Sequence, residues 1–258
     1  MNIKVQTDRR RFEILALIEK SGEVRIHDLA ELFDVTDMTI RRDLNRLSEL
    51  GFIKRVHGGA RAGKKEDMLF HITVKGRSIE FIEEKRQIGE KALQYVSEGK
   101  LIFIHGGSTT LEMAKRLPSD KNLQIMTNSL RIMETLIEME NIDLLCTGGI
   151  FNRISKTYYG PHAEALVGSV NIDILFMGSN GISIEKGLSE FDFNVANFKK
   201  KIIEQSKLRI LMADSHKFNV ERSSSYARIE DFHVLITDSK IDRNIHDALV
   251  QLGIKVIT

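Results

Sequence analysis

A run of small and hydroxyl-bearing residues, Gly106-Gly107-Ser108-Thr109-Thr110, is suited to holding a phosphate group. The run follows a short apolar stretch, 101–104, and leads into residues 111–117, which have helical spacing. Glycines before a helix leave backbone N–H groups open to an anion, and the helix dipole favours negative charge there. An ordinary strand-to-helix turn also uses Gly, Ser and Thr, so the run predicts either a phosphate site or a plain turn.

Other polar residues follow further apolar runs of the chain. They are His105, Asn128-Ser129, Thr147-Gly148-Gly149, Gly178-Ser179-Asn180-Gly181 and Asp214-Ser215-His216-Lys217. Ligands of open α/β sheets bind beyond the carboxyl ends of the strands. We therefore expect these residues to lie at one sheet edge, beside the Gly106 run.

Acid–base chemistry is the alternative use of this edge. Glu190, Asp192, Asp214 and Lys217 offer the carboxylates and the amine that a sugar-phosphate isomerase or deaminase needs. Three of these residues also have a structural explanation, because Asp192 can cap the helix after it, and Asp214 and Lys217 can form a structural or ligand-holding pair. We predict no catalytic residue, and we expect Glu190, Asp192, Asp214 and Lys217 to contact a bound effector instead.

The elements that must position these residues alternate between strands and helices. The predicted strands are 101–104, 123–127, 142–146, 173–177, 208–213, 234–237 and 255–257, and a helix is predicted over 79–96. This order predicts an α/β fold with a mainly parallel, helix-covered sheet.

A second kind of chemistry is predicted for residues 36–47. Thr36 is a good N-cap, and Ile40, Leu44 and Leu47 recur with the spacing of one buried helix face. The outward side is then basic and rich in hydrogen-bond donors. With Thr36 at the helix start, the predicted DNA-contact residues of this helix are Thr39, Arg41, Arg42, Asn45 and Arg46. Such a face suits nucleic acid, although a solvated basic face is also common.

The flanking residues favour nucleic acid. Residues 26–33 predict a short helix with Leu29, Leu32 and Phe33 on its apolar face, and only a tight turn separates it from the next helix. Residues 52–57 then alternate before Gly58-Gly59, which predicts a basic wing with Lys54, Arg55 and His57. A first helix over 8–20 would pack behind this pair, with Arg9, Arg10 and Arg11 solvated or touching the DNA backbone. A winged domain that only mediates protein contacts remains an alternative.

Composition sets the outer limits of the interpretation. The chain has 258 residues, of which 42% are hydrophobic, enough for two packed domains, and it has no apolar run long enough to span a membrane. With no signal-peptide core, we expect a cytoplasmic protein. The lone cysteine, Cys146, is expected in the core, and we expect no metal and no cofactor.

The charge is divided unevenly along the chain. Residues 1–61 hold 12 Lys and Arg against 10 Asp and Glu, which accounts for the whole net charge of +2. A module with so small a surplus can neutralise only a few phosphates. We therefore expect salt-sensitive binding by two or more copies, as a homodimer or homotetramer.

The segment IHDLAELFDVTDMTIRRDLNRLSELGFIKRVHGGA resembles the winged helix-turn-helix of the DeoR family of bacterial sugar-metabolism repressors. The segments IFIHGGSTTLEMAKRL, IMTNSL, LFMGSNGI and ILMADSHKF follow in that family's order. The resemblance implies a repressor of carbohydrate-metabolism genes that binds operator DNA. It also implies an effector domain similar to ribose-5-phosphate isomerase, which senses a phosphorylated sugar or related metabolite. The expected domains are 1–61 for DNA binding, a linker over 62–78, and 79–258 for the effector.

The resemblance also implies roles for individual residues. Gly107, Ser108, Thr109 and Thr110 fall on the phosphate loop, and Asn128, Gly148-Gly149, Asp214 and Lys217 fall on other family motifs. Residues 187–192, with Lys199 in the helix after them, resemble the branch that includes glycerol-3-phosphate repressors. His105 and His216 depart from the residues usual in the family, Asp and Ser, so the identity of the effector stays open.

Overall fold

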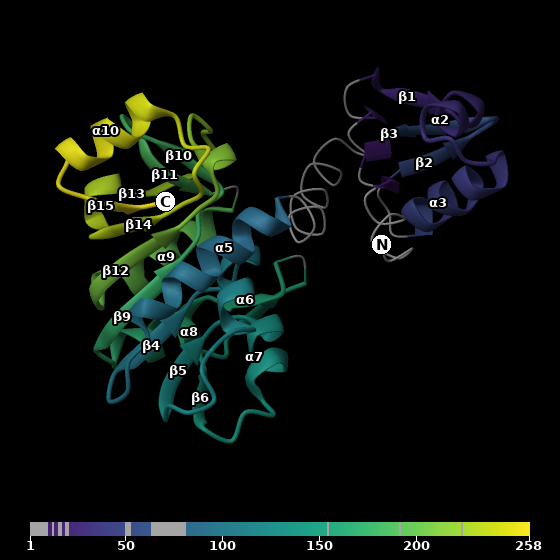
Figure 1. Ribbon diagram of the computed structural model, residues 1–258. Coiled ribbons are helices and arrows are strands. Elements are labelled where there is room, and N and C mark those ends of the chain that lie inside the picture. The colour runs from purple at the N-terminus through teal and green to yellow at the C-terminus, as the bar shows by residue number, and fades with distance from the viewer. Residues whose placement is uncertain are drawn as a thin grey trace. The chain divides into compact units, whose positions relative to one another are not determined.

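The chain divides into two compact units, Met1–Glu80 and Phe81–Thr258 (Figure 1). The computed structural model describes residues 10–11, 13–14, 17–18, 21–49, 53–62, 81–153, 155–190, 192–222 and 224–258. The expected linker therefore lies almost wholly outside the described residues, as do Thr7, Gly51 and Phe52. In the described part, no helix is long and apolar enough to cross a membrane.

The N-terminal unit has the predicted winged helix-turn-helix. Its elements are β1 (Glu23–Arg25), α2 (Ile26–Leu32), α3 (Asp37–Glu49), β2 (Ile53–Val56) and β3 (Gly59–Ala62). Strands β2 and β3 form the wing hairpin, and β1 pairs antiparallel with β3, which the sequence did not predict. Gly58 turns the hairpin with a left-handed φ of 75°.

Helix α3 begins and packs as its sequence predicts. The Thr36 hydroxyl accepts a hydrogen bond from the Thr39 N–H at 3.3 Å, so it caps the helix. Ile40, Leu44 and Leu47 are all buried in one core with Ile14 and Ile18. The prediction for Leu32 is wrong: its side chain is 62% exposed, and Ile26, Leu29 and Ala30 form the buried side of α2 instead.

A buried ion-pair cluster joins α3 to the residues before β1. Asp43 is 1% exposed, and its two carboxylate oxygens accept from the Arg10 Nε at 2.7 Å and the Arg11 Nε at 2.6 Å. Arg10 and Arg11 are therefore partly buried and bound to Asp43 within the unit. From the sequence we expected them to be solvated or to touch the DNA backbone, and we did not predict this internal ion pair.

The C-terminal unit is built on a seven-stranded parallel sheet in the order β15-β14-β12-β9-β4-β5-β6. The strands are β4 (Leu101–Ile104), β5 (Leu123–Thr127), β6 (Ile142–Cys146), β9 (Ile172–Met177), β12 (Ser206–Met212), β14 (Val234–Ile236) and β15 (Lys255–Ile257). All seven predicted strands are present, which confirms the α/β fold.

Helices cover both faces of this sheet (Figure 1). One face packs against α5 (Ile82–Ala92), α6 (Ser108–Ala114) and α7 (Leu130–Leu136). The other packs against α8 (Pro161–Gly168), α9 (Phe193–Glu204) and α10 (Arg243–Gln251). Short 3₁₀ turns are η2 (Leu93–Tyr95), η3 (Ser215–Lys217) and η4 (Ile229–Asp231).

Two small antiparallel sheets were not predicted. One pairs β7 (Ile150–Asn152) with β8 (Thr157–Tyr159), and the other has the order β10-β11-β13, from Gly181–Ser183, Gly187–Glu190 and Ser224–Ala227. Both follow strands of the main sheet at their carboxyl ends, so they help to shape the edge where ligands of such sheets bind.

The prediction for Cys146 is also wrong, because its side chain is exposed. It ends β6, which is one of the two edge strands of the main sheet and whose side chains are half-buried or exposed. An apolar strand at a sheet edge has a neighbour on only one side, so its side chains are less completely covered.

The ion-pair cluster gives the first testable prediction. Changing Asp43 to Asn leaves two partly buried guanidinium groups without their carboxylate, so we expect the free energy of unfolding to fall by about 2 kcal/mol. Urea unfolding of the full chain, followed by circular dichroism, measures the change. Asp34→Asn, at an exposed turn residue, is the matched control. Equal stability of the two variants would show that the cluster contributes nothing.

Candidate nucleic-acid interface and ligand site

The outward face of α3 presents the residues predicted for DNA contact. Arg41, Arg42, Asn45 and Arg46 are exposed and Thr39 is half-buried, whereas the capping residue Thr36 is exposed at the helix start. Exposed arginine and asparagine side chains on one helix face can donate to phosphates and to base edges in a major groove.

The wing adds cations beside this helix. Lys54 and His57 are exposed, and Arg55 is half-buried. Burial lowers the pKa of Arg55, and the nearby Arg41 guanidinium lowers it further. Arg55 Nη1 is buried with no hydrogen-bond partner among the described residues. Two close arginines with an unsatisfied donor form a favourable place for an anion such as a DNA phosphate.

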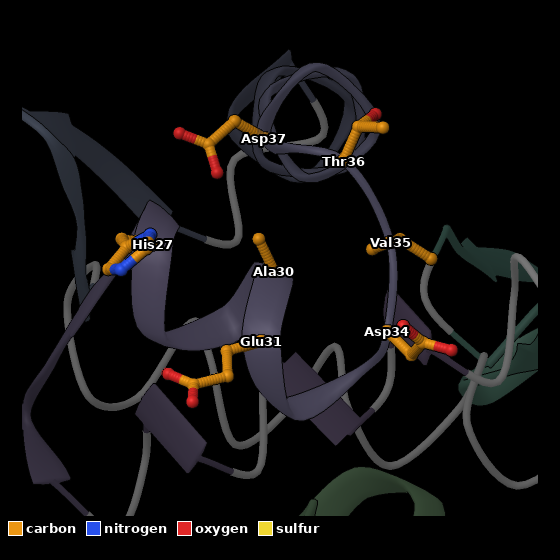
Figure 2. Close-up of a pocket in the computed structure, with 7 residues that line it drawn as sticks. All are labelled: His27, Ala30, Glu31, Asp34, Val35, Thr36 and Asp37. Atoms are coloured by element: carbon orange, nitrogen blue, oxygen red, sulfur yellow. The ribbon is translucent and has the colours of Figure 1, made fainter.

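A hollow between α2 and α3 carries the opposite charge. Figure 2 shows the residues around it, with Thr36 and Asp37 at the start of α3 and Ala30 on α2. Its lining includes the carboxylates of Glu31, Asp34 and Asp37. Because these groups repel phosphate, the hollow does not suit the DNA backbone, and the arginine face and the wing remain the candidate interface.

Met38 is a residue of this face that sequence reasoning missed. Its side chain is 58% exposed. We did not predict Met38 because the DNA-contact residues were chosen by their polar and charged side chains. The available signal was its position four residues before Arg42 and seven before Asn45, which places all three on one helix face.

The second site lies at the carboxyl edge of the parallel sheet. The Gly106 N–H donates to the Asn128 Oδ1 at 2.9 Å, and the Asn128 Nδ2 donates to the Tyr158 carbonyl at 3.1 Å. A Cβ at Gly106 would lie 2.4 Å from the Thr157 Cγ2. Gly106 and Asn128 therefore fix the loop, and the structure gives their polar atoms partners inside the protein.

The start of α6 remains the candidate phosphate cradle. Gly107 is the N-cap residue, and no side chain caps the helix. Ser108 is half-buried and Thr109 is 7% exposed. The Thr110 hydroxyl instead donates to the His105 carbonyl at 2.6 Å. Gly107, Ser108 and Thr109 thus offer backbone and hydroxyl donors, whereas Thr110 has an internal role.

His105 is buried beside this loop. Neither of its ring nitrogens has a hydrogen-bond partner among the described residues. Burial lowers the pKa of His105 well below its usual value, and the Lys199 ammonium adds to the effect. The imidazole is therefore neutral near pH 7, and it is a buried polar group that a ligand hydroxyl could satisfy.

Lys199 and Glu190 form a buried pair near the same edge. The Lys199 ammonium contacts the Glu190 carboxylate, donates to the Gly178 carbonyl at 2.8 Å and lies 4.8 Å from the centre of the Tyr226 ring. The other Glu190 oxygen accepts from Asn180. Burial, together with the Glu190 carboxylate, raises the pKa of Tyr226 well above its usual value.

Tyr226 was not predicted at this edge, whereas Asn180 was expected there by its position after a strand and Lys199 was named through the family resemblance, neither with a stated ligand contact. Lys199 had a signal, because the neighbouring Ala196, Phe198 and Ile202 mark the buried side of a helix, and a lysine on such a side needs a partner. Tyr226 had none, since only the pairing of β13 with β11 brings it to this edge.

Asp214 is a further buried carboxylate at this edge. It is 0% exposed, and neither of its oxygens has a hydrogen-bond partner among the described residues. The His216 Nδ1 lies 3.6 Å from Asp214 Oδ1. The His216 ring stacks on Phe81 with a centroid distance of 3.5 Å. The Lys217 N–H donates to the Asp214 carbonyl at 3.0 Å, so Lys217 closes the same 3₁₀ turn.

Other predicted ligand residues have local roles in the structure. The Asp192 carboxylate accepts from the Asn194 N–H at 2.8 Å and caps α9, as its structural explanation expected. Gly149 has a left-handed φ of 103°, and a Cβ there would lie 2.5 Å from the Tyr159 carbonyl. Gly148, with a φ of 60°, completes this turn. In the described part of the chain, no group of His, Cys, Asp and Glu is arranged to hold a metal.

A winged helix-turn-helix unit and a separate α/β unit with a polar sheet edge define a DNA-binding regulator that carries a ligand-sensing domain. Residues 10–66 match the family model of the DeoR-like helix-turn-helix domain, and residues 80–239 match that of the DeoR C terminal sensor domain. The chain belongs to the DeoR family of transcriptional regulators.

Two relatives that are named as transcriptional regulators agree with this assignment. HTH-type transcriptional regulator GlpR of Haloferax volcanii is 30% identical over 252 residues, which cover 96% of each chain. The putative aga operon transcriptional repressor of Escherichia coli O157:H7 is 30% identical over 253 residues, covering 97% of this chain and 93% of that one. Ribose 5 phosphate isomerase A from Neisseria gonorrhoeae is similar with a TM-score of 0.37 and 19% identity, over 54% of this chain and 53% of that one.

The buried His105 predicts a pH dependence of stability. Its pKa is lower in the folded chain than the usual value of about 6.5, so the unfolded chain gains a proton first as the pH falls. The contribution of the neutral His105 imidazole to the free energy of unfolding is therefore complete above pH 6.5 and is lost as the pH falls. Between pH 6.5 and 5.5 the free energy of unfolding should decrease by about 1 kcal/mol. We expect His105→Asn to flatten this dependence in urea unfolding, unlike His162→Asn at an exposed site. Parallel pH profiles of wild type and His105→Asn would contradict the prediction.

Proposed function

We propose that this regulator represses carbohydrate-metabolism genes, and that a phosphorylated sugar or related metabolite, bound at the carboxyl edge of the sheet, changes its affinity for operator DNA. The observation that carries this proposal is the pair of buried polar side chains at that edge, His105 and Asp214, which have no hydrogen-bond partners among the described residues. Buried polar atoms of this kind are costly unless something satisfies them, so they favour a polar ligand.

The chemistry of the edge suits a hydroxylated anion. Gly107, Ser108 and Thr109 offer amide and hydroxyl donors to a phosphate at the start of α6. Asp214 accepts hydrogen bonds from hydroxyl groups, and the neutral His105 can both donate and accept. Phosphate at one end and hydroxyls along the rest describe a sugar phosphate or polyol phosphate.

Side-chain contacts connect this edge to the first residues of the sensor unit. Phe81, the first residue of the unit, stacks on His216, which follows Asp214 in the edge loop. Glu84, in the first turn of α5, pairs with Lys240 at 2.6 Å. A ligand that moves the Asp214 loop would therefore move the start of α5. To act as a switch, it must bind the DNA-competent and DNA-incompetent arrangements with different affinity.

We propose binding rather than turnover at this edge. Of the carboxylates considered for catalysis, Asp192 caps α9, and Glu190 is engaged by Lys199 and Asn180. An isomerase or deaminase is the alternative. Incubation of the purified chain with ribose 5-phosphate and glucosamine 6-phosphate, followed by product analysis, tests it, and formation of product would overturn binding alone.

We also propose the boundaries of the domains and the oligomeric state of the protein. The DNA-binding domain is 1–61, the linker 62–78 and the effector domain 79–258, in a cytoplasmic homodimer or homotetramer. Two copies would place two α3 helices in successive major grooves of an operator, with Lys54, Arg55 and His57 on the backbone.

Loss of Arg42 should weaken DNA binding. We expect Arg42→Ala to reduce affinity for the operator about tenfold or more, because an arginine in the major groove contributes about 1–3 kcal/mol. Fluorescence anisotropy with duplexes from upstream of the chain's own gene, at several salt concentrations, measures it. Arg243→Ala, at an exposed side chain of α10 in the other unit, is the control. No specific binding to any duplex would favour a winged domain that binds protein, and equal affinities of the two variants would remove Arg42 from the interface.

The ligand is identified by a thermal-shift screen of phosphorylated sugars, glycerol phosphate and their unphosphorylated forms. At one hundred times its dissociation constant, a ligand adds roughly 2.7 kcal/mol of stability, which is a visible shift. Only phosphorylated compounds should stabilise the protein, and Ser108→Ala with Thr109→Ala should reduce the shift. Ser169→Ala, an exposed hydroxyl elsewhere, is the control. A shift that survives the double change would exclude the cradle, and no shift with any compound would exclude a sugar-phosphate effector.

A further inference from the structure

An apolar side chain, Met38, lies on the polar face of α3, in the first turn of the helix. Met38 is 58% exposed, although the other outward residues of this helix are charged or polar. Single exposed hydrophobic residues are common, so exposure alone indicates nothing. The position of Met38 relative to its neighbours on the helix is what points to a function.

Met38, Arg42 and Asn45 form one row along α3. At 100° per residue, positions 38, 42 and 45 lie within about 60° of each other, and their mean direction is opposite to that of Ile40, Leu44 and Leu47. Ile40, Leu44 and Leu47 are buried in the core of the unit. The row Met38-Arg42-Asn45 is therefore the part of α3 that projects furthest from that core, and this part enters a groove first.

The three side chains of the row differ in the base chemistry that they match. Arginine pairs with the O6 and N7 atoms of guanine, and asparagine with the N6 and N7 atoms of adenine. Met38 has no strong donor or acceptor, and the apolar feature of the major groove is the 5-methyl group of thymine. Met38 is also at the second position of α3, and the first residues of a recognition helix contact base edges.

We propose that Met38 is a specificity-determining residue that selects thymine in the operator by packing its thioether side chain against the 5-methyl group. This inference rests on the proposed role of α3 as the DNA-recognition helix. The four residue-to-residue steps from Met38 to Arg42 span about 6 Å along the helix axis, close to two base-pair steps of 3.4 Å. The selected thymine therefore lies about two base pairs from the guanine that Arg42 contacts.

Replacing thymine by deoxyuracil tests the contact directly, because this change removes the methyl group and keeps every hydrogen-bonding atom. Duplexes that bind the full chain are first selected from a random library. Each thymine of the best duplex is then replaced singly by deoxyuracil, and affinities are measured by fluorescence anisotropy at one salt concentration. We expect one thymine in each half-site to show about a fourfold loss, the equivalent of burying one methyl group.

The same scan with variants assigns the loss to Met38. Met38→Ala should bind the thymine and deoxyuracil duplexes equally at that position, whereas Met38→Leu should keep most of the difference. Leu32→Ala is the matched control, because Leu32 is the other large exposed apolar residue of the described part of this unit and lies on α2. It should leave the wild-type pattern unchanged.

The outcomes separate this inference from the proposed function. If no thymine is sensitive to its methyl group, or if Met38→Ala keeps the same sensitive position as wild type, the inference is wrong and DNA binding stands. If the selection enriches no duplex and binding does not depend on salt, both the inference and the DNA-binding role fail.

Discussion

The parallel hydrogen-bonded ladder of the main sheet is the constraint on which the sensor unit depends. Seven strands that run in one direction bring all their carboxyl ends to one edge. Backbone bonds continue past the strands, from the His105 N–H to the Phe176 carbonyl and from the Thr147 N–H to the Thr127 carbonyl. These bonds hold the first residues of the edge loops in place. Residues that are far apart in the chain therefore lie close together at the edge because the backbone of the sheet positions them.

The sequence pattern was sufficient to predict the strands of the main sheet and the helix-turn-helix. The central strands β4, β5, β9 and β14 are largely buried apolar runs between polar or glycine-rich segments, which is the pattern of strands covered on both faces. The strands β7, β8, β10, β11 and β13 have three or four residues and mixed polarity, and they form because partner strands are available. Such pairing is a tertiary effect that local periodicity does not contain.

In the candidate sites, the sequence likewise predicted the positions of individual residues but not the contacts between them. Position after a strand was enough to place His105, Asn128 and Asp214 at the edge. Their partners were not predictable, because Lys199 reaches Gly178 and Phe81 reaches His216 across more than twenty residues of sequence. Exposure was misjudged for Leu32 and Cys146, since a hydrophobic residue is buried only where another element covers it.

Exposed Cys146 also has a practical consequence. It is the one cysteine in the whole sequence, it ends edge strand β6, and its sulfur accepts from the Gly148 N–H at 3.4 Å. A maleimide dye would therefore attach at one known position per chain, next to the loops that follow the strands of the sheet. The native protein thus provides its own attachment point for an optical reporter of ligand binding. The same thiol calls for a reducing agent in storage, because two chains joined through it would imitate a natural dimer on a sizing column.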